Sequence, residues 1–258
     1  MLELPGGQLI ALDTVKNVAE KLNQCGVLLE NGIGLDYSGV DSVADSKVEY
    51  HRIIVPRGGE YNLKLADGTS VWVFAESEIR FPTRFKGNKR EVYLEGEAYF
   101  DVFHDPAHPF YVKTKSLDVK VLGTSFNVKA YRNSGVVETS LVEGVVSVKD
   151  NVLRPDIQAT YYEQSGDFSY RKIKGENYRL RKEQMFVFEE ERLDDILQEM
   201  ARWYDFEVFY QNPEMAEKRF GFKLEKYEHV DSLLKILELT GEVKFEMLGK
   251  SLTVKSGS

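Results

Sequence analysis

Cysteine is nearly absent from this sequence, since Cys25 is the single thiol among 258 residues. One thiol cannot close an internal disulfide, and it cannot supply the several thiolates of a structural zinc site. Such scarcity is compatible with a compartment where thiols are a liability, such as the periplasm. A disulfide framework and a cysteine-based zinc cluster are therefore excluded.

Long apolar runs are missing as well. No stretch approaches the roughly 18 apolar residues that a membrane-spanning helix requires. The first residues, Met1 to Pro5, lack the charged start and the apolar centre of a signal peptide. Either the protein is cytoplasmic or the chain is a piece of a longer protein, and Met1 directly before a strand-like segment favours a piece.

Positive charge is in deficit, with 34 Lys and Arg against 42 Asp and Glu and a net charge of -8. An acidic chain repels phosphate backbones, and no lysine or arginine block is dense enough to act locally. Nucleic-acid binding through a broad basic face is therefore disfavoured. Phosphate-loop and kinase motifs are absent, and the stretch 123–127 lacks the second glycine of a nucleophile elbow.

Aromatic residues are abundant, with 14 Tyr and 15 Phe in a chain that is 42% hydrophobic. The hydrophobic fraction is ordinary for a folded protein, and the aromatic surplus favours strands, where such side chains pack well. A length of 258 residues indicates two domains.

Closely spaced strands and turns dominate residues 1 to 170. Tyr61, Leu63 and Leu65 alternate along one strand, and Asp67-Gly68 then predicts a tight turn into a second strand at 69–74. Further strands are expected at 91–95, 97–103, 110–114, 117–122, 125–131, 136–142, 144–148, 158–162 and 168–171. This spacing predicts an all-β domain over 1–170, sandwich-like or solenoid-like, that includes N-terminal lead-in strands.

The pattern changes after a basic segment, 171–183, that is interpreted as a linker. Apolar residues at helical spacing predict amphipathic helices at 192–204 and from Val230 to Leu237, with Gly241 placed as a left-handed cap. Short strands are expected at 186–188, 207–210, 220–224, 243–247 and 251–254. The order β-α-β, then β-α-β-β, predicts a small α+β domain at 184–258, so that the whole protein is mainly β with two domains.

Two histidines four residues apart, His104 and His108, are the first candidate for metal chemistry. On a helix they would form a ligand pair. Pro106 and Pro109 rule out a regular helix there, so a turn between strands is the favoured interpretation and no metal site is assigned.

Two carboxylates separated by a glycine, Glu95 and Glu97, are the candidate for acid-base chemistry. Such a pair on one strand face could divide the two roles of glycoside hydrolysis. Paired carboxylates are more often solvated strand residues, and Gly96 suggests a bend or bulge. No catalytic residue and no cofactor are therefore assigned.

Aromatic residues cluster in the second domain, at Trp203, Tyr204, Phe206, Phe209 and Tyr210. The favoured interpretation is the core at a helix-to-strand junction. The alternative is a partly exposed patch that binds a partner.

A resemblance becomes specific between residues 54 and 148. The stretches that carry it are VPRGGEYNLKLADGTSVW, FP with Phe85, REVYLEGEAYFDV, HPFYVKT, VKVLGTSFNVKAY and VETSLVEGVVSV. In this order they resemble the FecR domain of Bacteroidetes-type anti-sigma regulators. The last 75 residues are similar to the C-terminal domain of these proteins, which is related to the short N-terminal domain of secretins and TonB-dependent transducers.

The resemblance implies a three-part parent protein: a cytoplasmic sigma-binding segment, a helix in the inner membrane and this periplasmic portion. On this reading the chain has no sigma-binding segment of its own. It would receive a signal by binding the N-terminal signalling domain of a TonB-dependent outer-membrane transporter, and the parent would control an extracytoplasmic-function sigma factor. The imported ligand of such relatives is often a siderophore or a glycan.

Free strand edges of the second domain are the predicted partner-binding site, because another strand can pair with their backbone groups. The candidate residues are Val208, Tyr210, Phe220, Phe222 and Leu224. A second set is expected to specify the fold of the first domain: Arg57, Gly58, Gly59, Asp67, Gly68, Gly96 and Gly123. The rival hypothesis is a carbohydrate-binding β module that senses a glycan directly through its aromatic residues.

Overall fold

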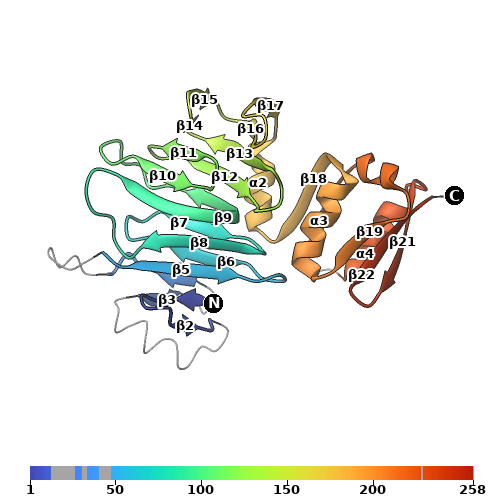
Figure 1. The fold of residues 1–258 in the computed structure, drawn as a ribbon, viewed down its shortest axis with the longest axis horizontal. Helices are drawn as coiled ribbons and strands as arrows, with labels where there is room; N and C mark the ends of the chain where they lie inside the picture. Colours follow the sequence, from blue (N-terminus) through green and yellow to red (C-terminus); the bar gives the residue numbers. More distant parts are fainter. Residues whose placement is uncertain (13–26, 31–33, 41–47, 228, 258) are drawn as a thin grey trace. The chain divides into compact units, whose positions relative to one another are not determined.

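The structure, a computed structural model, describes residues 1–12, 27–30, 34–40, 48–227 and 229–257 (Figure 1). Contacts divide the chain into two compact units, Met1–Gly175 and Glu176–Ser258, and the division falls inside the segment predicted to be a linker. Cys25 lies outside the described residues. No helix among the described residues is long and apolar enough to cross a membrane.

Unit 1 is built from strands, most of them short. They are β1 (Leu2–Glu3), β2 (Leu9–Ile10), β3 (Leu28–Glu30), β4 (Gly34–Asp36), β5 (Tyr50–Val55), β6 (Tyr61–Lys64), β7 (Ser70–Val73), β8 (Ser77–Pro82), β9 (Arg90–Asp101), β10 (Phe110–Lys113), β11 (Asp118–Val121), β12 (Ser125–Ala130), β13 (Val136–Glu143), β14 (Val146–Val148), β15 (Asn151–Leu153), β16 (Ile157–Tyr162) and β17 (Phe168–Lys172). The prediction of an all-β first domain is confirmed.

Two series of paired strands share β9. One series runs β2-β1-β5-β8-β9-β10-β11-β14-β15. The other runs β3-β4-β6-β7-β9-β12-β13-β16-β17. Most neighbours are antiparallel, while β9–β10 and β4–β6 are parallel. Unit 1 is therefore a stack of two sheets joined through one long strand (Figure 1).

The shared strand β9 changes sheets at Gly96. Residues 90–95 pair with β10 and β8, whereas residues 96–101 pair with β12 and β7. Gly96 has a φ of +101°, and a Cβ on it would lie 2.6 Å from the Cα of Ser77. The sequence predicts separate strands at 91–95 and 97–103, and this is wrong in one respect: the glycine bends the strand without ending it.

The core of unit 1 lies between the two sheets. Phe100 and Phe126, from the second series, stack with ring centroids 5.2 Å apart, and Phe110, from the first series, lies 6.2 Å from Phe100. All three are fully buried. The alternation seen in the sequence thus follows from each strand placing every second side chain in this core.

His51 is a buried polar group in this core. It is 2% exposed, its Nδ1 lies 2.7 Å from the hydroxyl oxygen of Tyr37, and its ring packs edge-on against Tyr37 and Phe81. Burial disfavours the charged imidazolium and lowers the pKa of His51 from 6.5 to about 4. The folded protein therefore holds His51 neutral over a pH range in which the unfolded chain protonates it.

We expect the free energy of unfolding to fall as the pH drops from 6.5 to 4, because the unfolded state binds the extra proton in that window. The loss from this one group reaches about 3 kcal/mol, and it is absent above pH 6.5. Urea unfolding at a series of pH values measures it. The matched control is His51→Gln, which keeps a polar partner for Tyr37; an equal slope between pH 5 and 6.5 in both proteins would contradict the assignment.

Unit 2 contains α2 (Gly175–Lys182), which begins at the last residue of unit 1, β18 (Met185–Arg192), α3 (Leu193–Tyr204), β19 (Glu207–Tyr210), the 3-10 helix η1 (Pro213–Glu217), β20 (Arg219–Glu225), α4 (Val230–Glu238), β21 (Val243–Leu248) and β22 (Ser251–Ser256). The predicted β-α-β, β-α-β-β order is confirmed. Helix α2 occupies most of the segment interpreted as a linker, and Arg181 on it forms a 2.6 Å ion pair with Glu199 of α3.

Unit 2 contains two small sheets. β18 pairs with β20, and β19, β22 and β21 form a three-stranded sheet in that order. Helix α3 begins with Asp194 and Asp195, where acidic groups complement the helix dipole, and it ends at Asp205 in the left-handed conformation. The apolar faces of α3 and α4 lie in one buried core, which includes Ile196, Met200, Leu233 and Leu237.

Candidate partner-binding site

Both predicted strands of unit 2, β19 and β20, are edge strands. β19 pairs only with β22, and β20 pairs only with β18, among the strands of the described residues. Each therefore carries one side whose backbone groups are not used by another described strand. Both strands therefore lie at sheet edges, as the sequence predicts. Their role in binding a partner stays a prediction.

The five side chains assigned to partner binding face inward. Phe220 is buried, and Val208, Tyr210, Phe222 and Leu224 are partly buried and pack against the core of unit 2. The hydroxyl of Tyr210 donates to Asp194 at 3.1 Å, and burial together with this carboxylate raises the pKa of Tyr210. These side chains help to hold the strands against the core, so docking at the edges would rely on the free backbone groups.

The outward face of β20 is charged. Arg219, Lys223 and Glu225 alternate with the inward apolar residues and are exposed. The guanidinium of Arg219 donates to the backbone oxygen of Glu190 at 2.7 Å. Alternation of side chains across the strand thus places charge on one face and the core on the other.

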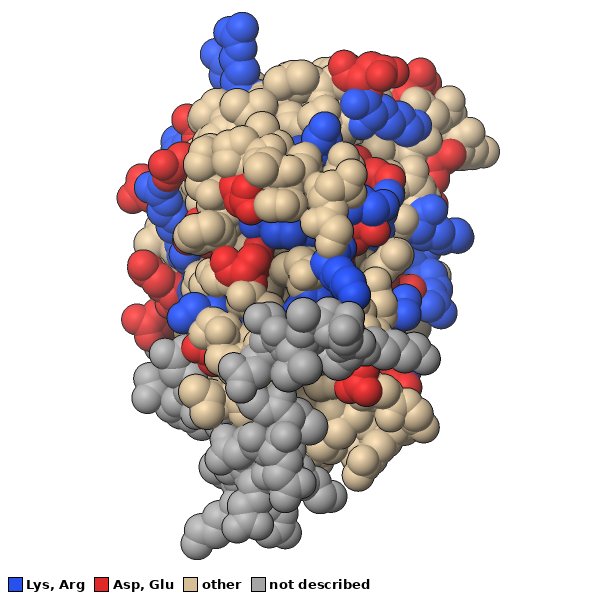
Figure 2. All heavy atoms as spheres, turned by 90° about the vertical axis from the view of Figure 1, so that its left-hand side faces the viewer, with Lys and Arg blue, Asp and Glu red and all other residues tan. Residues whose placement is uncertain are grey.

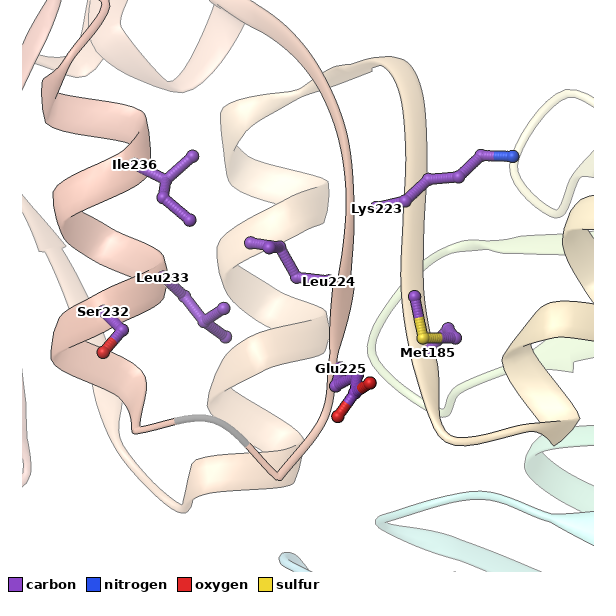
Figure 3. A pocket seen from close by; sticks show the side chains of 7 residues that line it. All are labelled: Met185, Lys223, Leu224, Glu225, Ser232, Leu233 and Ile236. Atoms are coloured by element: carbon purple, nitrogen blue, oxygen red, sulfur yellow. The ribbon is translucent and has the colours of Figure 1, made fainter.

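A hollow of about 460 Å³ lies beside β20, and α4 forms its other wall (Figure 3). Leu224, Leu233 and Ile236 converge on it, whereas Lys223 points away. Met185, Lys223, Glu225 and Ser232 complete the lining. Apolar side chains therefore line the gap between the strand edge and the helix.

Sequence reasoning missed the helix wall of this hollow. The apolar stripe that the sequence predicts for α4 comprises Val230, Leu233, Leu234 and Leu237, and Ile236 lies outside it. Ile236 is 38% exposed, and Leu239 beyond the helix end is 86% exposed. An apolar residue on the polar side of an amphipathic helix was the signal that could have identified this wall.

Asp67, one of the residues predicted to specify the fold of unit 1, contacts the buried Arg90. Asp67 accepts hydrogen bonds from the backbone N–H and the hydroxyl of Thr69, and it forms a 2.6 Å ion pair with Arg90. Gly68 follows at a φ of +89°, which closes the turn between β6 and β7. Asp67 and Gly68 thus connect a turn to a charged group inside the protein.

The remaining members of that set lie at turns and close contacts. Arg57 forms an ion pair with Glu76 at 3.4 Å, and Gly58 and Gly59 follow it between β5 and β6. A Cβ on Gly123 would lie 2.5 Å from the Cα of His104, so this position has no room for a side chain.

The two candidate motifs for chemistry have structural roles. His108 pairs with Asp105 at 2.7 Å in a non-helical loop, and this hydrogen bond lowers the pKa of Asp105. Glu97 is buried and accepts a hydrogen bond from Asn127 at 3.0 Å, whereas Glu95 is exposed and pairs with Arg132. Within the described residues, no group of three His, Cys, Asp or Glu side chains is arranged to hold a metal ion.

The aromatic cluster of the second domain is mostly core. Phe206 is 3% exposed, and Trp203, Tyr204 and Tyr210 pack against the core, while Phe209 is 50% exposed. The indole N–H of Trp203 and the hydroxyl of Tyr204 both donate to the backbone oxygen of Lys226. The favoured interpretation, a helix-to-strand core, therefore holds for all but Phe209.

Charges of both signs are interspersed over the face drawn in Figure 2. In unit 1, charged side chains pair across neighbouring strands, as Lys113 on β10 does with Glu91 on β9. Arg80 lies over the ring of Tyr50 at 4.3 Å and near that of Tyr93 at 5.4 Å. Tyr50 and Tyr93, which are partly exposed on the sheet that contains β5 and β8, thus each have the Arg80 guanidinium near their ring.

Comparisons with known proteins agree on one family. Residues 51–147 match the family described as FecR protein, and residues 185–254 match the one described as FecR, C-terminal. No curated protein matches the sequence. Two crystal structures of a "putative anti-sigma factor" from Parabacteroides distasonis ATCC 8503, at 1.65 and 2.50 Å resolution, are similar to this chain.

The two structures superpose with a TM-score of 0.73 each, at 26% and 25% sequence identity. The match covers 80% and 81% of this chain and 99% and 100% of the other. Both units of the present fold are matched by family, and the two matched stretches together span more than half of the chain. The chain therefore belongs to the FecR family.

Proposed function

We propose that this chain is the periplasmic sensor region of a transmembrane anti-sigma factor. It receives a signal by binding the N-terminal signalling domain of a TonB-dependent outer-membrane transporter. The parent protein, anchored in the inner membrane, passes the signal to an extracytoplasmic-function sigma factor. The observation that carries the proposal is the pair of family matches, one on each unit, together with two structural relatives named as anti-sigma factors.

The described surface supports binding as the activity. Unit 2 presents two edge strands, β19 and β20, and a strand edge is a ready template for another strand. The carboxylates that suggested acid-base chemistry are separated, because Glu97 is buried against Asn127 and Glu95 is exposed. We therefore assign the chain a regulatory binding role and no catalytic residue.

Direct glycan sensing is the second hypothesis. Sugar rings stack on exposed aromatic faces, and Tyr50 and Tyr93 are partly exposed on one sheet. The guanidinium of Arg80 already lies against both rings, which leaves less aromatic face for a sugar. No observation on the described residues favours a glycan over a protein as the ligand, and a glycan titration distinguishes the two hypotheses.

Isothermal titration calorimetry tests the proposal. The signalling domain of a TonB-dependent transporter whose gene neighbours the parent gene is titrated into this chain, and a panel of glycans is titrated separately. We expect a dissociation constant of roughly 1–10 μM or tighter for the signalling domain, in the range of transient signalling contacts, and no heat with the glycans. Heat with a glycan and none with the signalling domain would replace the proposal by the second hypothesis.

A further inference from the structure

Among the described residues, one edge of β20 has free backbone groups, and its hydrogen bonds to the residues flanking β18 show which residues these groups belong to. The N–H of Lys226 donates to Gln184, and the oxygen of Lys218 accepts from Leu193, both toward β18. Successive residues of a strand direct their backbone groups to opposite sides. Arg219, Gly221, Lys223 and Glu225 therefore direct their N–H and C=O groups away from β18, where no other strand of the described residues pairs.

The hollow lies along the same open side. Leu224 of the strand and Leu233 and Ile236 of the helix point into it (Figure 3). A strand added to the edge of β20 would place every second side chain over these three residues and the others toward solvent. The edge thus offers backbone pairing and an apolar floor in one place.

We propose that this groove between β20 and α4 binds an extended segment of the transporter's signalling domain as a third strand of the β18-β20 sheet. The proposal rests on the proposed function, since it takes its partner from there. The segment carries apolar side chains at alternate positions, which fill the hollow, and an acidic side chain beside Lys223 on the outward face.

The charges on the outward face of β20 favour an acidic side chain in the incoming strand. Lys223 is exposed and forms no ion pair among the described residues, and Arg219 donates to a neutral backbone oxygen. Two cations therefore border the open edge, against one carboxylate at its end, Glu225. An acidic side chain of the incoming strand would pair with Lys223 across the strands.

The other edges of unit 2 are less suitable. β18 carries a bulge at Glu190, with a φ of +50°, and bulges disrupt strand pairing. β19 has four residues against seven in β20, and it does not line the hollow. Length and an apolar floor thus favour β20.

A second copy of this chain is a poor occupant. Pairing β20 with the same strand of a second copy, around a two-fold axis, would bring the second α4 to the same side of the sheet. That layer already contains the buried faces of α3 and α4. A slim extended segment avoids this overlap.

Proline substitution at the open edge tests the groove by calorimetry with the same signalling domain. Lys223→Pro removes an N–H that points outward, and we expect binding to weaken at least about 10-fold. The matched control is Val208→Pro. Glu207 and Gln211 direct their N–H groups to β22, so Val208 directs its own to the open side of β19. This control is expected to bind within about twofold of the original chain.

Side-chain variants decide the outcome if the proline variant fails to fold by circular dichroism. Ile236→Asp places a charge in the hollow and is expected to weaken binding about 10-fold or more. Lys223→Glu keeps the backbone groups and is expected to weaken it about 5-fold. Normal binding by folded Lys223→Pro or Ile236→Asp, or loss in Val208→Pro alone, overturns the groove while leaving the proposed function intact. Absence of binding by the original chain overturns both.

Discussion

Replacing Gly96 with alanine is expected to destabilise unit 1 by about 3–5 kcal/mol. Two costs combine at this residue. Its φ of +101° is a conformation that L side chains rarely adopt, and the new Cβ would lie 2.6 Å from the backbone of Ser77. Ser77 cannot easily retreat, because its hydroxyl accepts a hydrogen bond from the N–H of Glu97 and donates to Ala75.

Gly87→Ala is the matched control for Gly96→Ala. Gly87 has a φ of +91°, but no atom of the described residues lies within 4 Å of the position its Cβ would take. It therefore carries only the backbone cost, expected to be about 1–2 kcal/mol. Similar losses in the two variants would mean that the contact with Ser77 is unimportant and that β9 tolerates a different bend.

Unfolding of unit 1 can be followed separately in the whole chain. The two tryptophans are Trp72 in unit 1 and Trp203 in unit 2, so a Trp203→Phe background leaves only the first as a fluorescent reporter. Urea unfolding in that background gives the free energy of unit 1 for each variant. A single reporter matters because a two-unit chain need not unfold in one step.

Replacing Arg90 with methionine is expected to destabilise unit 1 by about 3–5 kcal/mol. The side chain of Arg90 is 3% exposed. Its guanidinium donates to the carboxylate of Asp67 at 2.6 Å and to the backbone oxygens of His108 at 2.8 Å and Phe103 at 2.9 Å. Methionine fills much of the volume but leaves the carboxylate of Asp67 without its cation. A buried charge that loses its partner costs more than the pair contributes.

Arg132→Met is the control for Arg90→Met. Arg132 pairs with Glu95 at 2.7 Å, but its side chain is 71% exposed. An exposed ion pair is worth about 0–1 kcal/mol, so this variant is expected to unfold almost as the original chain does. A loss in Arg90→Met no larger than in Arg132→Met would show that the buried network is not what connects the 65–69 turn to the loop after β9.

Periodicity predicted the fold well where each strand or helix has one apolar face. Helices α3 and α4 and the strands of unit 2 fall close to the expected ranges, because Ile196, Met200, Leu233 and Leu237 repeat at helical spacing and enter one core. Likewise Tyr61, Leu63 and Leu65 predicted β6 and its turn at Gly68. In these segments the local pattern and the tertiary packing agree.

Features that depend on distant contacts could not be predicted. Gly96 was expected to separate two strands, and only the pairing of β9 with strands of both sheets explains why the strand continues. Helix α2 has little apolar periodicity, so its basic sequence predicts a linker and gives no sign of a helix. Arg90 looks like any surface cation in the sequence, and its burial follows from backbone oxygens that come from a loop 13 to 18 residues away.

The candidate binding strands differ from the prediction chiefly in where their side chains point. The strands β19 and β20 were correctly located at sheet edges, but their five apolar side chains face the core. Inward packing and outward docking favour the same residue types, so the sequence alone could not separate them. The role of Ile236 as a wall of the hollow depends on the tertiary placement of α4 beside β20, which the sequence does not give (Figure 3).

Hydrogen exchange of the complex with the signalling domain tests the central claim most directly. If an extended segment pairs with the open edge of β20, the amides of Gly221 and Lys223 should exchange at least about 10-fold more slowly in the complex, while those of β19 stay unchanged. Binding without added protection anywhere in residues 219–225 would contradict the account.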